Sequence, residues 1–361
     1  MSERQIILVG GGHSHLEVLK LITKKQVSGA KFTLISKERF VYYSGMMPRL
    51  IMGDISKNEL KIDLLQLATR CGWTFICDEV VAVNSTTKSV RLSCGDELYY
   101  DLLSLNLGGH QEKLSPIDSS SLVYLRPFSE FLNKWHEIQR ICSICQSPDF
   151  IVVGGGAAAV EVAVALKVKL NKNHATGSQV HLVSIGQRLC EGYFESVSKK
   201  IQNKVSQLGV VLHLNEHITS IEKGRVTLKL GKFLQFNKVF VATPNKRVLL
   251  MQGKADDCLR LKDDVFVVGE GAELNSYPDL PRSGVVAVRQ GQLLGKNILR
   301  WLRSQPLQKF KADKYYLNIL VTSERKAALV WGPIFFEGRL PRILKDFIDK
   351  KYIKSFRLPR S

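Results

Sequence analysis

Three stretches of the chain share one pattern, an apolar run that leads directly into glycine. Residues 5–9 and 150–153 are apolar, each is followed by three glycines, and each glycine turn opens a helical pattern. A strand, a glycine turn and a helix start together bring backbone N–H groups and a positive helix end to a pyrophosphate. The third run, 264–268, ends at Gly269 and Glu270. The repeated pattern predicts two βαβ units, two dinucleotides and electron transfer between them.

The first glycine turn departs from the full GxGxxG pattern. Gly10 and Gly12 are present, but His15 stands at the third position, where the helix would lie closest to the sheet. We expect His13 and His15 to cap or pack at the helix N-terminus. A His-x-His metal site is rejected, because no further ligands lie nearby and the positive helix end disfavours a second cation. The second turn has Gly154 and Gly156, with Ala159 as an allowed third residue.

The strand after each turn ends in serine. A dinucleotide fold normally carries Asp or Glu there, to bond the adenosine ribose. Residues 31–36 end at Ser36, and residues 179–184 end at Ser184, with Arg188 four positions later. The missing carboxylate removes the usual NAD contact, and Arg188 could meet a 2′-phosphate or be a solvated surface charge. The choice between NADH and NADPH therefore stays open.

The region between the two turns carries weaker signals. Residues 39–49 read as an aromatic-rich loop with no cysteine, which leaves disulfide-reductase chemistry unsupported. A polar linker is expected at 111–122 and an amphipathic helix at 127–145, with a Cys-x-x-Cys at its C-terminal end. A redox pair needs a helix N-terminus, so these cysteines are predicted to be structural. Strands are expected at 74–83, 88–93, 96–100 and 102–107.

The second half is predicted to contain a helix at 194–208, several short strands within 210–241, and a helix from Gly284 to about Arg303. Two strands, 315–320 and 327–331, and a basic amphipathic helix, 340–356, follow. This helix has an apolar stripe on one side and cations on the other, and it could lie on an anionic bilayer. The alternative is that its apolar face packs on its own domain or on a twin subunit.

Composition bounds the class of protein. The chain has 361 residues, 45% of them apolar, and a formal charge of +19, which fits two or three domains and an anionic partner. The sequence shows no membrane-spanning run, no secretory signal and no disulfide spacing, so we expect a cytoplasmic protein with reduced cysteines. Nucleic acid is the least favoured partner, because no aromatic-and-basic segment resembles an RNA-binding motif.

These motifs occur in the order found in two-dinucleotide flavoproteins. The chain resembles the pyridine nucleotide-disulfide oxidoreductase superfamily, and within it the type II NADH dehydrogenases and the NADH-dehydrogenase-like module associated with selenophosphate synthetase. The resemblance rests on the two glycine turns, on residues 43–48, on 241–244, on 265–270 and 283–291, and on the ending from Trp331 to Asp349.

The resemblance implies an α/β fold with two Rossmann-like three-layer domains, the second inserted in the first, and a small C-terminal α+β region. FAD would bind residues 1–110 and 245–303; residues 111–148 would form a linker and helix, 149–244 the NAD(P) domain, and 304–361 a strand pair with the basic helix. The implied FAD residues are Gly10, Gly12, His13, Ser14, Ser36, Lys37, Arg39, Ser44, Gly45, Pro48, Val80, Asn106, Gly108, Gly269, Glu270, Ser283, Gly284 and Val285. The implied NAD(P) residues are Gly154, Gly156, Ala159, Glu161, Ser184, Arg188, Thr243 and Pro244.

The predicted activity is hydride transfer from NADH or NADPH to FAD, then electron transfer to a quinone or another small acceptor. No acid–base residue is required for the hydride step, because the protein's role is position and electrostatics. No cysteine follows Cys258, which disfavours sulfide:quinone chemistry. The alternative is a flavin-binding scaffold of selenium metabolism with a vestigial nicotinamide site. A peripheral position on the inner face of the cytoplasmic membrane and a homodimer are further expectations.

Overall fold

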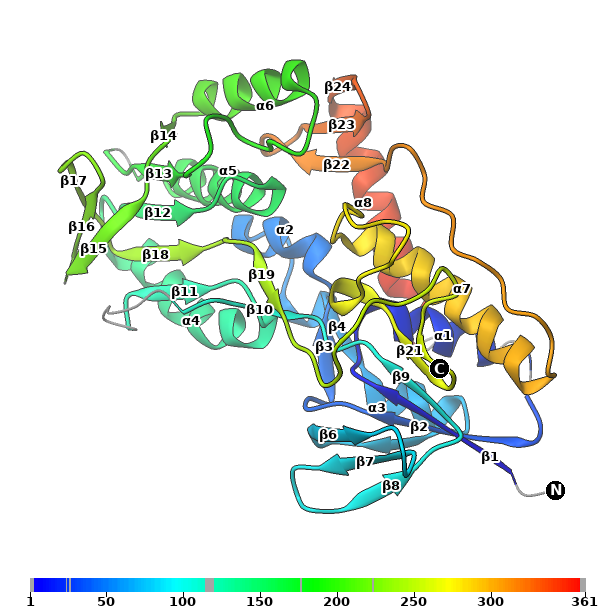
Figure 1. Cartoon of the computed structure of the whole chain (residues 1–361). Helices are drawn as coiled ribbons and strands as arrows, with labels where there is room; N and C mark the ends of the chain where they lie inside the picture. The colour runs from blue at the N-terminus through cyan, green and yellow to red at the C-terminus, as the bar shows by residue number, and fades with distance from the viewer. Residues whose placement is uncertain are drawn as a thin grey trace.

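The computed structural model describes residues 3–23, 25, 27–113, 120–175, 177–222 and 224–357. Within these ranges the chain forms two mainly parallel sheets and a small antiparallel sheet beside a long helix. Figure 1 shows the first sheet in the lower half, with the N-terminus, and the second sheet at the upper left. The antiparallel sheet and the last helix lie at the upper right, against both units.

The first parallel sheet is built from two separate segments of the chain, residues 4–105 and 260–267. Its strands are β1 (Arg4–Val9), β2 (Ala30–Ile35), β5 (Thr74–Ile76), β9 (Leu102–Leu105), β20 (Arg260–Lys262) and β21 (Val265–Val267). Their spatial order is β20-β21-β9-β1-β2-β5, and only β20 runs antiparallel to its neighbour. The carboxyl ends of β1, β9 and β21 therefore lie side by side.

Alternate residues of β1 supply the two faces of this sheet. Ile6 and Leu8 belong to the core formed with α1 (His13–Thr23) and α7 (Gly284–Leu302). Ile7 and Val9 belong to a separate core. That core is shared with β6 (Val80–Asn84), β7 (Ser89–Leu92) and β8 (Glu97–Tyr99), which form a three-stranded meander. Because successive strand side chains point to opposite faces, one apolar run supports both outer layers.

The second sheet repeats this three-layer plan. Its parallel strands, in spatial order, are β11 (Leu122–Tyr124), β18 (Lys238–Val241), β12 (Phe150–Val153), β13 (Val180–Val183) and β14 (Val210–His213). Its helices are α4 (Phe128–Ile144), α5 (Ala157–Lys172) and α6 (Glu195–Gln207). Its meander is β15 (Ile218–Glu222), β16 (Arg225–Leu228) and β17 (Phe233–Gln235).

Between the turns the structure differs from the predictions at the two ends of the linker and in the aromatic loop. The expected linker 111–122 contains the end of β10 (Gly109–Gln111) and the start of β11, an edge strand of the second sheet, while residues 114–119 lie outside the described part of the chain. The expected loop 39–49 forms β3 (Phe40–Tyr42) and the start of α2 (Met47–Met52). The two elements of this loop are ordered by other parts of the chain, since β3 pairs with β4 (Lys61–Asp63) and α2 packs on α5.

The remaining elements complete the connections. β10 pairs with β19 (Asn245–Arg247) where the chain leaves the first unit and returns to it. The helix α3 (Leu64–Arg70) follows β4, and short 3-10 turns occur at Ser44–Met46, Lys57–Glu59 and Gly269–Gly271. The residues predicted as one strand, 74–83, divide between β5 of the sheet and β6 of the meander, which point to different layers.

The C-terminal region contains three strands rather than the predicted pair: β22 (Asn318–Val321), β23 (Ala327–Trp331) and β24 (Ile334–Gly338). The helix α8 (Arg339–Lys354) follows β24 directly. Among the described residues, no helix combines the length and the apolar character that a membrane span needs.

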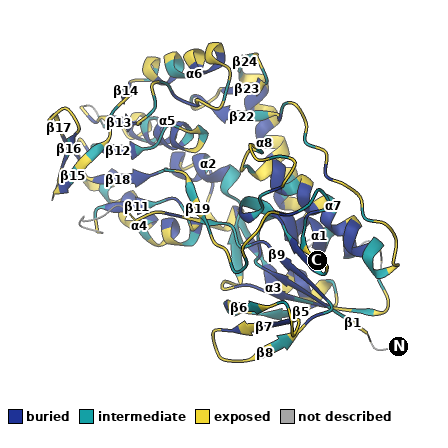
Figure 2. Ribbon diagram, viewed as in Figure 1, coloured by how far each residue is buried: buried dark blue, intermediate teal, exposed yellow. Residues whose placement is uncertain are grey.

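The orientation of α8 excludes packing of its apolar stripe on its own chain. Figure 2 shows exposed and buried residues along this helix, and the buried ones include Arg342, Lys345 and Asp349. The exposed side chains of α8 include its large apolar ones, with 70% of Leu340 and 61% of Phe347 accessible, together with Lys350, Lys351 and Lys354. The charged face is turned inward because it meets carboxylates of the two dinucleotide units, as described below.

Candidate functional site

The first candidate site lies at the carboxyl edge of the first sheet. Gly10 follows β1, Asn106 follows β9 and Gly269 follows β21, so neighbouring strands bring the three residues together. Gly10 has φ +98°, and a Cβ there would overlap the carbonyl oxygen of Asn106. A Cβ on Gly12 would lie 2.7 Å from Asn106 Nδ2. Glycine is therefore required at both positions by the approach of β9.

Asn106 supplies a test of whether this turn fits a phosphate. Its side chain is 6% exposed, and its Nδ2 has no hydrogen-bond partner among the described residues. A Cβ on Gly269 would overlap Asn106 Oδ1, so the amide is fixed between Gly12 and Gly269. A buried donor without a partner costs free energy, and an oxyanion would satisfy it. The residues at this turn thus fit a pyrophosphate.

His15 fixes the turn from behind. Its Nδ1 lies 2.7 Å from the carbonyl oxygen of Gly10, and its Nε2 lies 2.8 Å from Ser104 Oγ. The carbonyl can only accept, so Nδ1 carries the proton and Nε2 accepts from the serine hydroxyl. Burial lowers the pKa of His15 to about 4, although the bond to Gly10 opposes the shift. The expectation that this histidine packs is confirmed.

The side chains of Ser14 and His13 are both engaged within the protein. The Ser14 hydroxyl donates to the carbonyl oxygen of Ala287 at 2.7 Å, so its side chain joins α1 to α7 and only its backbone N–H can face a phosphate. The His13 ring lies 5.6 Å from the Tyr43 ring and 5.8 Å from the Tyr352 ring. Burial, followed by the positive charge of Arg126, lowers the pKa of His13 to about 4. His13 is thus a neutral member of an aromatic cluster.

Arg126 is a site residue that the sequence did not indicate. One of its terminal nitrogens donates to Ser44 Oγ at 3.2 Å and lies 3.7 Å from a carboxylate oxygen of Glu270. The other oxygen of Glu270 accepts from Asn245 Nδ2 at 2.9 Å. Glu270 is therefore held by two donors from distant segments. No local pattern reveals this arrangement, because Ser44, Arg126 and Glu270 meet only through the fold.

Four other predicted FAD residues lie on or near the strands of the first unit, and two of them have ion-pair partners within the protein. Ser36 lies at the end of β2 and is buried, while Lys37 pairs with Glu79 and Arg39 with Asp63. The charges of Lys37 and Arg39 are therefore neutralised by these carboxylates. Either side chain could bind a phosphate only if its ion pair broke. Val80 belongs to the apolar core of the meander.

Further predicted residues surround the same edge. Gly108 has φ +69°, and a Cβ on Gly45 would overlap the Tyr43 ring. Pro48 lies in the first turn of α2. Ser283 is the N-cap of α7, its hydroxyl accepts from the N–H of Val286 at 3.4 Å, and a Cβ on Gly284 would meet nothing within 4 Å. Val285 is 38% exposed. The start of α7 is therefore open to a ligand.

The second candidate site is the glycine turn between β12 and α5. Gly154 has φ +139°, and a Cβ there would lie 2.5 Å from the carbonyl oxygen of Ala242. Gly156 is the N-cap of α5, and a Cβ there would meet nothing within 4 Å. Ala159 is fully buried, as close helix packing requires. This turn keeps the required backbone shape but is open on its outer side.

Thr243 and Pro244 follow β18 beside this turn, and the carbonyl oxygen of Thr243 accepts from Gln111 Nε2 at 3.1 Å. Ser184 lies at the end of β13, where its hydroxyl accepts from the N–H of Gly186 at 3.2 Å. These residues lie at the carboxyl edge of the second sheet, the edge at which open α/β sheets bind ligands.

Glu191 supplies a carboxylate near the end of β13. It accepts from the N–H of Gln187 at 2.9 Å, and a Cβ on Gly186 would lie 2.8 Å from it. Arg188 folds toward the same segment, since its NH2 lies 3.5 Å from the carbonyl oxygen of Glu191, and its Nε is buried without a partner among the described residues. Sequence reasoning missed Glu191 because it looked for an acid at the strand end only.

Glu161 does not face a dinucleotide with its carboxylate. Its Oε1 accepts from the N–H of Val321 in β22 at 2.9 Å and lies 3.8 Å from Lys345 Nζ in α8. Lys345 also lies 3.6 Å from Asp349, which accepts from the Tyr43 hydroxyl at 2.9 Å. The prediction that the Glu161 side chain belongs to the NAD(P) site is therefore wrong. Glu161 instead belongs to a buried polar cluster that joins α5, α8 and Tyr43, the residue before the 3-10 turn Ser44–Met46.

Charges in this cluster hold one another in place. Burial opposes the charge of Lys345, but Glu161 and Asp349 keep its pKa above the ordinary lysine value. Burial raises the pKa of Asp349, with Lys345 and Tyr43 acting in the opposite direction. Burial, followed by the negative charge of Asp349, raises the pKa of the Tyr43 hydroxyl far above its ordinary value. The lysine is thus protonated at neutral pH and the tyrosine is a donor.

Curated relatives with similar sequences match almost the whole chain. A type II NADH:quinone oxidoreductase of Staphylococcus saprophyticus is 21% identical over 97% of this chain and 95% of its own length. A second protein of that name, from Haemophilus influenzae, is 20% identical over 85% and 83%.

Solved structures show the same fold. The structure of NDH2 from Plasmodium falciparum in complex with NADH has a TM-score of 0.82, with 13% identity, and covers 98% of this chain and 97% of that one. The sulfide:quinone oxidoreductase of Aquifex aeolicus has a TM-score of 0.81, with 15% identity and coverage of 98% and 91%. The family model for pyridine nucleotide-disulphide oxidoreductases matches residues 4–291. With two glycine turns on two parallel sheets, the chain belongs to this family of oxidoreductases.

Proposed function

We propose that this protein is an FAD-dependent NADH dehydrogenase that passes electrons to a quinone. The observation that carries the proposal is the pair of glycine turns, each shaped by a positive φ and by a neighbouring strand, at the carboxyl edges of two parallel sheets. Bound FAD would supply a ring that accepts hydride and gives up electrons. The names of the full-length relatives support NADH and quinone as the two substrates.

The residues divide the work between binding and positioning. Gly10, Gly12 and the unpaired amide of Asn106 would hold the FAD pyrophosphate, while Gly154 and Gly156 would hold that of the nicotinamide cofactor. Glu270, fixed by Arg126 and Asn245, would orient the ribityl chain of FAD. The free N-terminal end of α7 near Gly284 would stabilise negative charge on the reduced cofactor.

The buried cluster around Lys345 has a role in the quinone half-reaction. Reduction of a quinone to a quinol takes up two electrons and two protons, so this half needs proton donors where hydride transfer needs none. Protonated Lys345 and the Tyr43 hydroxyl, linked through Asp349, are donors at the junction of α8 with both dinucleotide units.

The Lys345→Met variant should keep flavin reduction by NADH and lose most quinone turnover.

Steady-state kinetics tests the quinone half directly. FAD-loaded protein should oxidise NADH in the presence of a water-soluble quinone analogue, and oxidation should stop when the quinone is omitted under argon. A protein that is reduced by NADH but is not reoxidised by any quinone would retain the dehydrogenase part of the proposal and refute the acceptor.

An anionic membrane surface is the second partner that we propose. The exposed apolar side chains of β23, β24 and α8 form one run along the C-terminal region, comprising Trp331, Ile334, Phe336, Leu340, Ile343, Leu344, Phe347 and Ile348. Lys350, Lys351, Lys354 and Arg357 follow on the same helix and its end. An apolar face rimmed by cations matches the outer layer of an anionic bilayer, where a quinone is dissolved.

Flotation with anionic vesicles at low salt tests this surface. The wild-type protein should float, and the Ile343→Ser/Phe347→Ser variant should remain in the dense fraction. A matched control removes the exposed apolar residues Val81 and Leu230, which lie in the meanders, and should float like the wild type. A stable dimer that ignores vesicles would assign the apolar face to a twin subunit instead.

A further inference from the structure

Two hollows lie at the end of the first unit opposite the glycine turn. They share Gln305, and they lie where α1 and α7 end and the chain turns toward the C-terminal region. The smaller has a volume of about 230 Å³ and the larger about 610 Å³. Neither belongs to the predicted dinucleotide sites.

The smaller hollow is lined by four cations and by no acid. Lys25, Lys296, Arg300 and Arg303 surround it, together with two glutamines and two leucines. Within the described part of the chain, none of the four forms an ion pair with a carboxylate. By contrast, Lys37, Arg39 and Lys345 each have an acidic partner. Four like charges around one hollow repel one another, and an anion would remove that cost.

The helix dipoles account for only part of this charge. α1 and α7 both end here, and Lys and Arg are favoured at helix C-termini. Each helix end carries about −0.5 of a charge, so the two ends balance about one of the four cations. A surplus of about three positive charges remains. Dipole compensation therefore explains one basic residue at this place but not four.

The wall of the hollow is held in a fixed position. Asn297 is fully buried in α7, and its side chain accepts from the N–H of Gln308 at 2.8 Å while donating to the carbonyl oxygen of Gln308 at 2.9 Å. Arg300 donates through Nε to the carbonyl oxygen of Pro306. The segment that follows α7 is thus fastened back onto the helix. The hollow exists before a ligand arrives.

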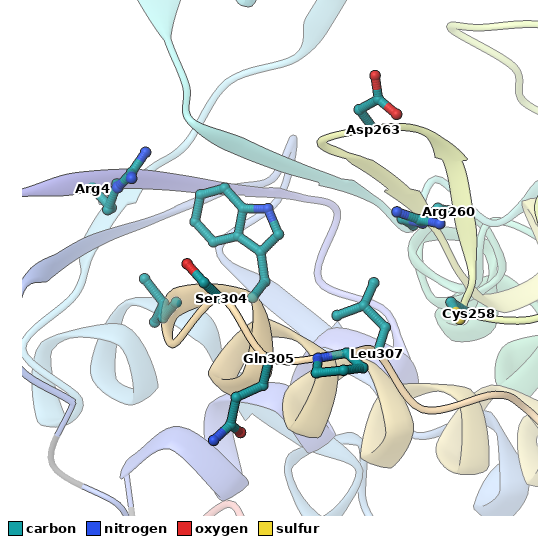
Figure 3. Close-up of a pocket in the computed structure, with 10 residues that line it drawn as sticks. Arg4, Cys258, Arg260, Asp263, Ser304, Gln305 and Leu307 are labelled. Atoms are coloured by element: carbon teal, nitrogen blue, oxygen red, sulfur yellow. The ribbon is translucent and has the colours of Figure 1, made fainter.

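The larger hollow adds an aromatic wall. Figure 3 shows Arg4 on one side of the hollow, with Arg260 and Asp263 across it. Trp301, in the last turn of α7, also lines this hollow. The Arg4 guanidinium carbon lies 5.6 Å from the Trp301 ring centre. The indole is held by its Nε1–H, which donates to Asp264 at 3.2 Å. A fixed indole beside a cationic hollow can contact a ring or sugar attached to a phosphate.

We propose that this pole of the first unit binds a phosphorylated ligand with two or more phosphate groups. The phosphates lie among Lys25, Lys296, Arg300 and Arg303, and the organic part lies against Trp301 in the larger hollow. The shared chemistry is a phosphate ester, whose source is either a free nucleoside diphosphate or a lipid headgroup.

Calorimetry on FAD-loaded protein with saturating NAD⁺ tests the proposal, because the two proposed dinucleotide sites are then filled. The probes are inorganic pyrophosphate and ADP. Both should bind, ADP the tighter of the two. The Lys296→Gln/Arg303→Gln variant should weaken both by about tenfold or more, since two charge-assisted contacts are lost. Trp301→Leu should remove the advantage of ADP and leave pyrophosphate unchanged.

The matched control is Arg91→Gln/Lys229→Gln, which removes the same charge from the exposed meanders. Equal weakening in the control would show that net charge alone attracts the probes and would overturn the site. Absence of saturable binding to the wild type would overturn it as well. A third arm uses phosphatidylcholine vesicles containing phosphatidic acid. If the protein bound these vesicles through Lys296 and Arg303 but did not bind ADP, the proposal of a free phosphorylated ligand would be overturned. The site would then be assigned to a lipid headgroup.

Discussion

The two glycine turns differ in how firmly the protein supports them. Behind the first turn, buried His15 bonds Gly10, Ser14 bonds α7, and the Asn106 amide is wedged between Gly12 and Gly269. The second turn is held by backbone contacts, since the N–H of Cys190 donates to the carbonyl oxygen of Gly155 at 2.6 Å, but Gly156 is open on its outer side. A rigid, enclosed turn suits a cofactor that stays bound, whereas an open turn suits one that exchanges at each turnover. The proposed function accordingly assigns the first turn to a resident cofactor and the second turn to one that exchanges.

The largest effects should come from adding a methyl group to each turn. Gly10→Ala and Gly154→Ala both place a Cβ against a backbone carbonyl at positive φ, and each should lower the free energy of unfolding by about 2 kcal/mol. Gly10→Ala should lose FAD, while Gly154→Ala should remain yellow but resist reduction by NADH. Absorbance of the purified variants separates the two. Loss of FAD from both variants would contradict the assignment of FAD to the first turn alone.

Acid should weaken the first turn through His15. Its pKa is about 4 in the folded protein and 6.5 in the unfolded chain, so its stabilising contribution is complete above pH 6.5 and is lost as the pH falls toward 4. The difference corresponds to at most about 3 kcal/mol. Denaturant titrations between pH 7 and 4 should show this slope. The His15→Leu variant should be less stable at pH 7 and show a flatter slope, and an unchanged slope would contradict the assignment.

Removing the Ser14 hydroxyl should have a smaller effect. Ser14→Ala deletes the bond to the Ala287 carbonyl and should lower the free energy of unfolding by about 1 kcal/mol. The affinity for FAD, measured by fluorescence quenching on reconstitution, should not change, because the hydroxyl is turned toward α7. A large loss of FAD affinity with normal stability would place the Ser14 side chain in the cofactor site after all.

The smallest effect concerns the choice of nicotinamide cofactor. The Glu191 carboxylate lies at the loop after β13, where a 2′-phosphate would meet negative charge. Glu191→Gln should lower the KM for NADPH a few-fold and leave that for NADH nearly unchanged. Initial rates with both cofactors measure the ratio. Glu195→Gln in α6 is the matched control, since it removes an exposed charge from the same region.

The sequence predicted those features of the fold that are encoded locally. Each glycine turn, with its strand before and helix after, lies in one short segment, and the apolar runs defined the parallel strands around it. The edge strand β11 and the helix α2 were missed, because each depends on a partner far along the chain. The strand β24 was missed although it pairs with the adjacent strand β23. The helical stripe of α8 was recognised, but its direction was not, since only the fold brings Glu161 and Tyr43 to the charged face.

The site divides in the same way. Gly10, Gly12, Gly154 and Gly156 lie at the two turns, as the motif requires. Arg126 could not be found from the sequence, because its contacts to Ser44 and Glu270 arise from three segments that are distant in the chain. Glu161 was assigned to the nucleotide by its place in the motif, whereas β22 and α8, which have no part in the motif, draw its carboxylate away.

Anaerobic mixing of the FAD-loaded protein with NADH tests the central claim most directly. If the braced turn holds FAD and the open turn delivers NADH to it, the flavin absorption band will bleach, and the Gly154→Ala variant will bleach far more slowly at the same FAD content. A yellow wild-type protein that neither NADH nor NADPH bleaches would contradict the account and leave a flavin-binding scaffold with a vestigial second site.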